Sequence, residues 1–195
     1  MELPVAVIIL AAGSSSRLGR PKQLLPYRGT TLLRHAVQTA LAADLGPVIV
    51  VLGAAEDTCR SALAGMPATI TANADWEEGM GGSIAAGMAV VADSDFRSAL
   101  LMLCDQPAIT PDMLRALDDY QHKIGASIVA SKFEGTLGPP VIFAASHFTQ
   151  LRELRGQQGA RSLFKNDPAG PATVDCPEAT WDIDTEEDAR MLHAQ

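Results

Sequence analysis

The loop from Gly13 to Lys22, GSSSRLGRPK, contains side chains that suit the binding of phosphate groups. It follows Val5–Leu10, an apolar run with the composition of a buried strand. Glycine lets a backbone approach a ligand closely, and serine amides and hydroxyls donate hydrogen bonds to anionic oxygens. Arg17 adds a planar fork of donors and Lys22 a compact charge. These residues are compatible with a phosphate-binding loop and also with a solvated loop that carries incidental basic residues.

The same loop does not match either of the two common phosphate motifs. A dinucleotide-binding loop requires G-x-G-x-x-G, and a P-loop requires G-x-x-x-x-G-K-[ST]. Here five residues separate Gly13 from Gly19, and Arg20 follows Gly19. Any phosphate binding must therefore use a different loop geometry.

Three aspartates form the second set of candidate chemical groups. Asp105 comes two residues after the apolar run Ala99–Leu103, and an aspartate there often only caps a turn or a helix. Asp182 and Asp184 are two positions apart, so they face the same side of an extended chain. Thr185 is a good N-cap for the following acidic segment, which explains that segment but not the paired aspartates.

The pattern along the chain predicts a three-layer α/β/α fold with a mostly parallel sheet, because continuous apolar strands alternate with helices. Strands are predicted at Val5–Leu10, Val48–Leu52, Ala68–Thr71, Ala99–Leu103, Ala126–Ala130 and Pro140–Phe143. Helices are predicted at Leu32–Ala43, Asp57–Ala64, Ser83–Val91, Pro111–Lys123, Ala145–Arg155, Ala160–Lys165 and Glu186–Ala194. Ligands of such sheets bind beyond the carboxyl ends of the strands, so the important loops should begin after Leu10, Leu52, Thr71 and Leu103.

Length and composition narrow the class of protein. The 195 residues are interpreted as one domain, residues 1–195. A net charge of −8 argues against nucleic acid and anionic membranes as partners, because both require a basic surface. Three widely spaced cysteines without a CxxC pair suit a reducing cytoplasm and argue against structural zinc. The apolar start is too short to span a bilayer and lacks the flanks of a signal peptide.

The stretch LAAGSSSRLGRPKQLLPYRGTTLL resembles the signature L-A-[AG]-G-x-S-x-R-[ML]-G-x-x-K of nucleotidyltransferases in the NTP-transferase superfamily. It is most similar to the molybdenum cofactor cytidylyltransferase branch, in which K-Q-L-L-P is typical. The resemblance implies a Rossmann-like nucleotidyltransferase fold. It also implies transfer of a nucleoside monophosphate from an NTP, with CTP favoured, to a phosphorylated acceptor, with molybdopterin the first candidate. Pyrophosphate would be released.

The resemblance also assigns roles on the nucleotide side. Arg17, Lys22 and Asp105 would be the catalytic residues. Ala12 stands where guanylyltransferase relatives tend to have glycine, so its methyl group could favour the smaller pyrimidine base. The segment Glu77–Met88 resembles the G-x-x-x-S segment that meets the base and ribose. The expected nucleotide-binding residues are Leu10, Ala11, Ala12, Gly13, Ser14, Ser15, Arg17, Lys22, Asn73, Gly81, Gly82 and Ser83.

The metal site follows from two further matches. LCDQP resembles the superfamily pattern L-x-D-x-P, and DIDTEED resembles D-I-D-T-x-E-D, with Glu186 where proline is common. By these matches Asp105 and Asp184 would hold Mg²⁺, which prefers few carboxylates together with phosphate oxygens and water. Asp182 would support them less directly. Two adjacent carboxylates repel each other, so replacing one is expected to preserve or slightly raise stability without metal.

The acceptor side is expected at Gly138, Pro139, Pro140, Gly159 and Arg161, in the segments TLGPPVIF and LRGQQGARSLF. Pro139 replaces a histidine common in the branch, and Gln157 replaces an aspartate. Both departures bear on the identity of the acceptor. Two other functions remain open: nucleotidyl transfer to a sugar 1-phosphate or another small phosphorylated metabolite, and a non-catalytic protein that binds nucleotide or delivers a cofactor. A molybdoenzyme or a chaperone is a possible partner in either case.

Overall fold

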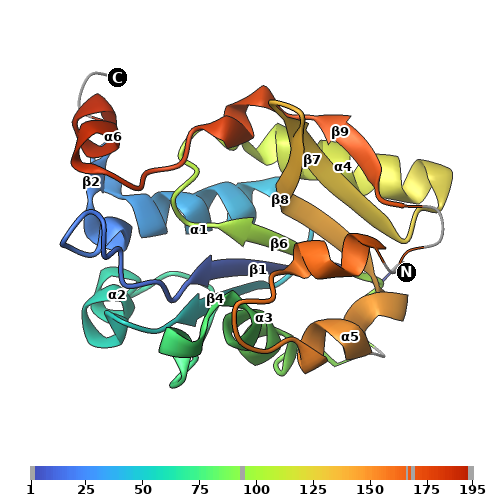
Figure 1. The fold of residues 1–195 in the computed structure, drawn as a ribbon, viewed down its shortest axis with the longest axis horizontal. Coiled ribbons are helices and arrows are strands. Elements are labelled where there is room, and N and C mark those ends of the chain that lie inside the picture. The colour runs from blue at the N-terminus through green and yellow to red at the C-terminus, as the bar shows by residue number, and fades with distance from the viewer. Residues whose placement is uncertain (1–2, 93–94, 166, 168–169, 193–195) are drawn as a thin grey trace.

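The protein has a seven-stranded sheet between two layers of helices, as the computed structural model shows (Figure 1). The structure describes residues 3–92, 95–165, 167 and 170–192. The three-layer α/β/α fold with a mostly parallel sheet is confirmed. No helix among these residues is long and apolar enough to cross a membrane.

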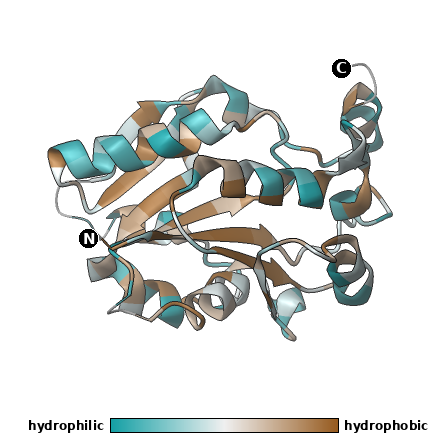
Figure 2. Ribbon diagram, turned by 180° about the vertical axis from the view of Figure 1, so that it is seen from behind, coloured by the Kyte–Doolittle hydropathy of each residue, from teal (hydrophilic) through white to brown (hydrophobic). Residues whose placement is uncertain are grey.

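The strand order of the sheet is β5-β4-β1-β6-β8-β7-β9. Strands β5, β4, β1 and β6 are mutually parallel, β8 runs antiparallel to both of its neighbours, and β9 is parallel to β7. Figure 2 shows how hydrophobic the central strands are. The strands are β1 (Val5–Ala11), β4 (Val48–Leu52), β5 (Thr69–Ala72), β6 (Ser98–Leu103), β7 (Ile128–Phe133), β8 (Thr136–Ala144) and β9 (Ala172–Asp175).

Alternate side chains of β1 enter different cores, as the two-residue period of a strand requires. Val5, Val7 and Ile9 pack with helices α1 and α4 on one face of the sheet. Ala6 and Ile8 pack with α3 and α5 on the other face (Figure 1). The helices are α1 (Leu32–Ala43), α2 (Glu56–Ala62), α3 (Met80–Met88), α4 (Pro111–Ile124), α5 (Phe148–Glu153) and α6 (Glu186–Met191).

The strands that the sequence pattern missed are short or polar. Strand β9 lies at an edge of the sheet and none of its residues is fully buried, so it lacks the apolar run used for prediction. A hairpin of two-residue strands, β2 (Pro26–Tyr27) and β3 (Thr30–Thr31), is too short to leave a periodic signal. The strands predicted at Ala126–Ala130 and Pro140–Phe143 extend toward each other as β7 and β8 and form a hairpin, whose turn places Glu134 and Gly135 at φ 45° and 74°.

Several predicted helices are shorter or differently wound. The segment predicted as Ala145–Arg155 divides into a 3₁₀ turn, Ala145–His147, and α5. Ala160–Lys165 is a 3₁₀ helix, a form common in short connecting pieces. Helix α6 ends at Met191, and the last two residues of that prediction, 193 and 194, lie outside the described residues.

Candidate active site

A lysine and two aspartates from three distant segments meet beyond the carboxyl ends of β1 and β6. These strands are paired in parallel with Leu10 opposite Leu103, so Asp105 emerges beside the loop that follows β1. The Ile183 amide donates to the Asp105 carbonyl at 3.0 Å, which draws the segment around Asp184 to the same edge. The Lys22 ammonium is ion-paired with Asp105 and, at 2.7 Å, with Asp184. The side chains of Lys22 and Asp105 are largely buried.

Arg17 lies at the outer side of this cluster. Its Nη1 donates to Asp184 Oδ2 at 2.8 Å, while 75% of the side chain remains exposed to solvent. An exposed pair of this kind contributes little to stability. Arg17 can therefore leave Asp184 for a phosphate group at small energetic cost.

The pKa values in the cluster follow from burial and charge. Burial lowers the pKa of Lys22, but Asp105 and Asp184 more than offset this effect, so its pKa lies above the ordinary value and the side chain stays charged. The hydrogen bond from Lys22 lowers the pKa of Asp184. Burial, and then the charge of Asp105, raises the pKa of Asp182 to about 6. The two aspartates, two residues apart, thus have opposite shifts.

The loop after β1 is held in shape by its own side chains. Ser15 adopts a left-handed conformation, with φ 56°, and its hydroxyl accepts a hydrogen bond from the Lys22 amide at 3.0 Å. Gln23 is only 1% exposed, and its Nε2 donates to the carbonyls of Ala11 and Gly13 at 2.9 and 2.8 Å. Gln23 was not among the expected site residues, although its place directly before two leucines was the available signal.

A cavity of about 390 Å³ lies beside this loop, and we call it the nucleotide-side cavity. Eight of the residues expected at the nucleotide or the metal line it: Leu10, Ala11, Ala12, Gly13, Ser14, Lys22, Ser83 and Asp105. Gly79 and Met80, from the segment Glu77–Met88 expected at the base and ribose, also line it, and so does Trp76, which was not expected. Trp76 lies in a 3₁₀ turn after β5, where no motif marks it.

Five expected nucleotide residues are not among those that line this cavity. Ser15 shapes the loop and Arg17 lies outside it, as described above. The Asn73 amide is committed to its own neighbours: Nδ2 donates to Ser83 Oγ at 3.0 Å, and Oδ1 accepts from the Asp75 amide. Gly81 and Gly82 permit close packing, since a Cβ on Gly81 would lie 2.7 Å from the Arg155 carbonyl oxygen and one on Gly82 3.2 Å from Asn73.

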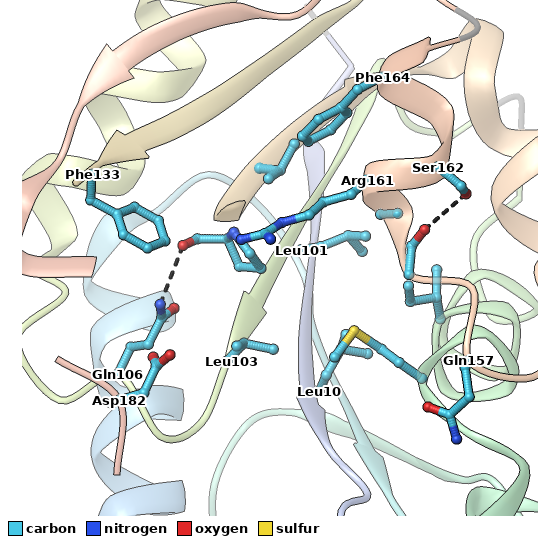
Figure 3. A pocket seen from close by; sticks show the side chains of 16 residues that line it. Leu10, Leu101, Leu103, Gln106, Phe133, Gln157, Arg161, Ser162, Phe164 and Asp182 are labelled. Carbon is cyan, nitrogen blue, oxygen red and sulfur yellow. Dashed lines mark hydrogen bonds between the residues drawn. The ribbon is translucent and has the colours of Figure 1, made fainter. Parts of the chain in front are cut away.

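A second cavity of about 430 Å³ adjoins the first, and we call it the acceptor-side cavity (Figure 3). The two cavities share Leu10, Met80, Leu103 and Gln157. Of the residues expected at the acceptor, Pro139, Gly159 and Arg161 line the second cavity.

The other two residues expected at the acceptor do not line this cavity. Gly138 and Pro140 are on β8 and are not among the lining residues. A Cβ on Gly138 would lie 2.8 Å from Arg161 Nη2 and 3.1 Å from Phe133. The absence of a side chain at position 138 therefore makes room for both of these lining residues.

The carboxylates of the cluster fit a hard divalent cation. Asp105 Oδ1 is buried and has no hydrogen-bond partner within the described part of the chain. Among the residues that the structure describes, no group of three or more histidine, cysteine, aspartate or glutamate side chains could form a metal site. A cation held by Asp105 and Asp184 would thus take its other ligands from phosphate oxygens and water, as Mg²⁺ does.

Two adjoining cavities lie at the carboxyl edge of a mostly parallel sheet, and paired cations and carboxylates lie at one of them. This is the place where α/β enzymes bind their ligands. Residues 7–172 match the family model of the MobA-like NTP transferase domain. The chain belongs to this family and is a nucleotidyltransferase.

Relatives match the chain along nearly its whole length. The chain is 34% identical to nicotine blue oxidoreductase of Paenarthrobacter nicotinovorans over 98% of both proteins. It is 31% identical to the purine catabolism protein PucB of Bacillus subtilis (strain 168), over 95% of this chain and 94% of PucB. The crystal structure of Rv0371c from Mycobacterium tuberculosis H37Rv has a TM-score of 0.86 and 32% identity over both complete chains. Rv0371c has also been solved with manganese, with a TM-score of 0.81 and 30% identity over both complete chains.

Proposed function

We propose that the protein transfers a nucleoside monophosphate from an NTP, with CTP favoured, to a phosphorylated acceptor, and that molybdopterin is the first candidate acceptor. The observation that carries this proposal is the ion-paired cluster of Lys22, Asp105 and Asp184 beside two adjoining cavities. One cavity has the charged loop that suits a triphosphate, and the other is largely apolar. Two substrates could thus meet at the shared wall.

The reaction needs no nucleophile from the protein. An oxygen of the acceptor phosphate attacks the α-phosphorus of the NTP in line, and the bond from this phosphorus to the bridging oxygen breaks. Pyrophosphate leaves with the electron pair of that bond. Positioning and charge neutralisation account for most catalysis of this type.

Each residue of the cluster has a distinct part in this proposal. Lys22 neutralises charge at the α-phosphate and on the departing pyrophosphate, and Arg17 binds the outer phosphates. Asp105 and Asp184 would hold Mg²⁺, which neutralises phosphate charge when bound. Ser15 and Gln23 keep the loop after β1 in the conformation that presents these groups.

Ala12 is the proposed determinant of base choice. Its side chain is buried at the nucleotide-side cavity, and a Cβ on Gly53 would lie 2.8 Å from it, so the methyl group has little freedom to move. Ala12→Gly should enlarge this corner and raise the affinity for GTP relative to CTP. Calorimetry of both nucleotides with Mg²⁺ and each protein tests this, and a wild-type preference for GTP would reject the assignment.

A pyrophosphate-release screen tests the activity itself. The four NTPs are each paired with molybdopterin and with glucose 1-phosphate, with and without Mg²⁺. Release that requires CTP, molybdopterin and metal supports the proposal, whereas release with glucose 1-phosphate supports the sugar alternative. Binding of CTP without release from any pair would favour a non-catalytic delivery protein.

The name of one relative suggests a further control. NADH and NADPH oxidation is followed in the same samples, because that relative is called an oxidoreductase. The loop after β1 lacks the glycine spacing of a dinucleotide-binding fingerprint. Oxidation of either cofactor in place of pyrophosphate release would overturn the proposed function.

A further inference from the structure

Gln106 is a buried side chain of the acceptor-side cavity with half of its hydrogen-bonding capacity unused. It is 5% exposed and lies beside Asp182 at one side of the cavity (Figure 3). Its Nε2 donates to the carbonyl oxygens of Ala179 and Pro139 at 2.9 and 3.3 Å. Its Oε1 is shielded from water and has no partner among the described residues. An unpaired buried acceptor is unfavourable, and a ligand that donates to it removes that penalty.

The orientation of this amide is fixed by its surroundings. A flipped amide would place Oε1 against the two carbonyl oxygens that Nε2 now contacts, and oxygen cannot donate to oxygen. The atom left for a ligand is therefore a hydrogen-bond acceptor. The bond to Pro139 is the longer and weaker of the two.

The rest of the cavity restricts what can lie against Gln106. Most of the wall is apolar, with Phe133 and Phe164 providing flat surfaces. Arg161 reaches over the cavity, and within the described part of the chain its guanidinium group makes no ion pair or hydrogen bond (Figure 3). The cavity thus combines a fixed acceptor and an available cation with an apolar interior.

We propose that Gln106 determines acceptor specificity, with its Oε1 accepting a hydrogen bond from an N–H group of a planar heterocycle in the acceptor substrate. Arg161 then attracts the anionic part of the same molecule. This assignment rests on the proposed function, and it names the recognition element that favours a ring with N–H donors. An acceptor that places no donor at Gln106 leaves the buried oxygen unpaired and binds more weakly.

A sugar is a poor match for the same cavity. Each of its hydroxyl groups requires partners, and a hydroxyl placed against Leu101, Val141 or Phe133 would lose its hydrogen bonds with water without replacement. A flat ring with one polar edge has no such cost. The cavity therefore favours the heterocyclic acceptor over the sugar 1-phosphate.

Direct binding of small probes tests the proposal. Dissociation constants are measured for pterin, whose edge carries N–H donors, and for quinoxaline, a bicycle of similar size without any N–H group. Glucose 1-phosphate represents the sugar alternative. The wild-type protein should bind pterin at least about tenfold more tightly than quinoxaline, the effect of one buried hydrogen bond. Equal binding of the two bicycles, or tighter binding of glucose 1-phosphate, overturns the proposal without any variant.

Variants then separate recognition from structural support. Gln106→Met should bring the ratio of the two dissociation constants close to one. The matched control is Gln121→Met, since Gln121, on α4, is about equally buried and accepts a hydrogen bond from Ser98 at the start of β6, away from the cavity. This control should keep the full ratio even if it melts at a lower temperature. A ratio that survives in a folded Gln106→Met protein shows that Gln106 only supports the wall, and overturns the proposal.

Failure of the Gln106 assignment can be distinguished from failure of the proposed function. Probe binding does not require turnover, and pyrophosphate release does not require discrimination between the bicycles. Discrimination without release would keep the assignment of Gln106 and reject the nucleotidyl transfer. Release without discrimination would keep the transfer and reject the assignment.

Discussion

The nucleotide-side and acceptor-side cavities adjoin but are built in opposite ways. At the first, charged groups from three segments are already paired, with Lys22 between Asp105 and Asp184. At the second, the wall is mainly apolar, and Gln106 Oε1 and the Arg161 guanidinium group have no hydrogen-bond or ion-pair partner in the described part of the chain. The charged groups of one cavity are thus organised before any ligand binds, whereas the other cavity keeps these two groups available for a ligand.

Under the proposed function, this difference suits the two substrates. Triphosphates carry the same charged oxygens in every NTP, so a prearranged cluster of cations and carboxylates serves them all. Acceptors differ in shape and in a few polar atoms, so an apolar cavity with few fixed groups can discriminate among them. Changes at the first cavity should therefore affect turnover, and changes at the second should affect the choice and affinity of the acceptor.

The largest effect is expected from Lys22→Ala. The variant removes a cation from the α-phosphate region and leaves two carboxylates to repel the triphosphate, so kcat should fall by about 10³-fold. Without nucleotide, the same variant should bind Mn²⁺ more tightly, because both carboxylates lose their ammonium partner. Steady-state kinetics and metal titration check the two results.

Arg20→Ala is the matched control for Lys22→Ala. Arg20 belongs to the same loop, but its side chain is exposed and pairs with Glu186 outside both cavities. Replacing Arg20 should leave kcat within about twofold of the wild-type value, because an ordinary surface ion pair contributes little. An equal loss in both variants would mean that the total positive charge of the loop matters and the prearranged cluster does not.

The next effect concerns the two carboxylates. Asp105→Asn and Asp184→Asn should each lower turnover by about 10²-fold, and the double variant should lose much less than the product. The reason is that neither carboxylate can place a metal ion without the other. Mg²⁺-dependent kinetics of the three variants check this prediction. Losses that multiply fully would mean that the two groups act independently.

Sequence and structure give opposite expectations for the stability of one variant of this pair. Two neighbouring carboxylates predict that Asp105→Asn preserves or slightly raises stability. The structure places the Lys22 ammonium against both, so the substitution should instead cost about 2 kcal/mol. Thermal melting with a chelator present decides between the two. The position of the Lys22 ammonium between the two carboxylates could not be inferred from the sequence, because Lys22 is 83 positions before Asp105 in the chain (105 minus 22).

More of the first cavity than of the second could be predicted from sequence. The loop after β1 has a long motif, and Asp105 follows an apolar strand, so both positions carry local signals. Gln106 and Phe133 carry none, since their role depends on how β8 packs and on where the segment before α6 returns to the sheet. Strand β9 was missed for the same reason: its position is fixed by pairing with β7, not by its own composition.

A smaller effect is expected from Gly138→Ala at the second cavity. The new methyl group would lie 2.8 Å from Arg161 Nη2 and must displace that side chain or Phe133. The KM for the acceptor should rise about fivefold to tenfold while the KM for the NTP stays unchanged, as expected for lost substrate binding. Gly87→Ala is the control, because its Cβ would press on Ile8 and Val51 in the core. It should lower stability by about 1–3 kcal/mol and leave both KM values unchanged.

The smallest effect tests how Asp182 differs from Asp184. The fold raises the pKa of Asp182 to about 6, so between about pH 4 and pH 6 the folded protein keeps a proton that the unfolded chain has lost. Stability contributed by this group therefore falls as the pH rises through that window. Asp184 has a lowered pKa, so its contribution is lost as the pH falls instead. Asp182→Asn should raise the melting temperature at pH 7 relative to wild type, with the difference disappearing near pH 3.5.

The melting curves are recorded with a chelator, so that no metal ion binds the neighbouring carboxylates. Because solvent reaches the Asp182 side chain, the shift at pH 7 should be on the order of 2 °C. Asp184→Asn is the internal control and should lower the melting temperature at pH 7, since it removes the partner of Lys22 and Arg17. If both variants moved the melting temperature in the same direction, the assignment of a raised pKa to Asp182 and a lowered pKa to Asp184 would be wrong. The two aspartates would then share one electrostatic environment, and the electrostatic difference between the two cavities would not extend to Asp182.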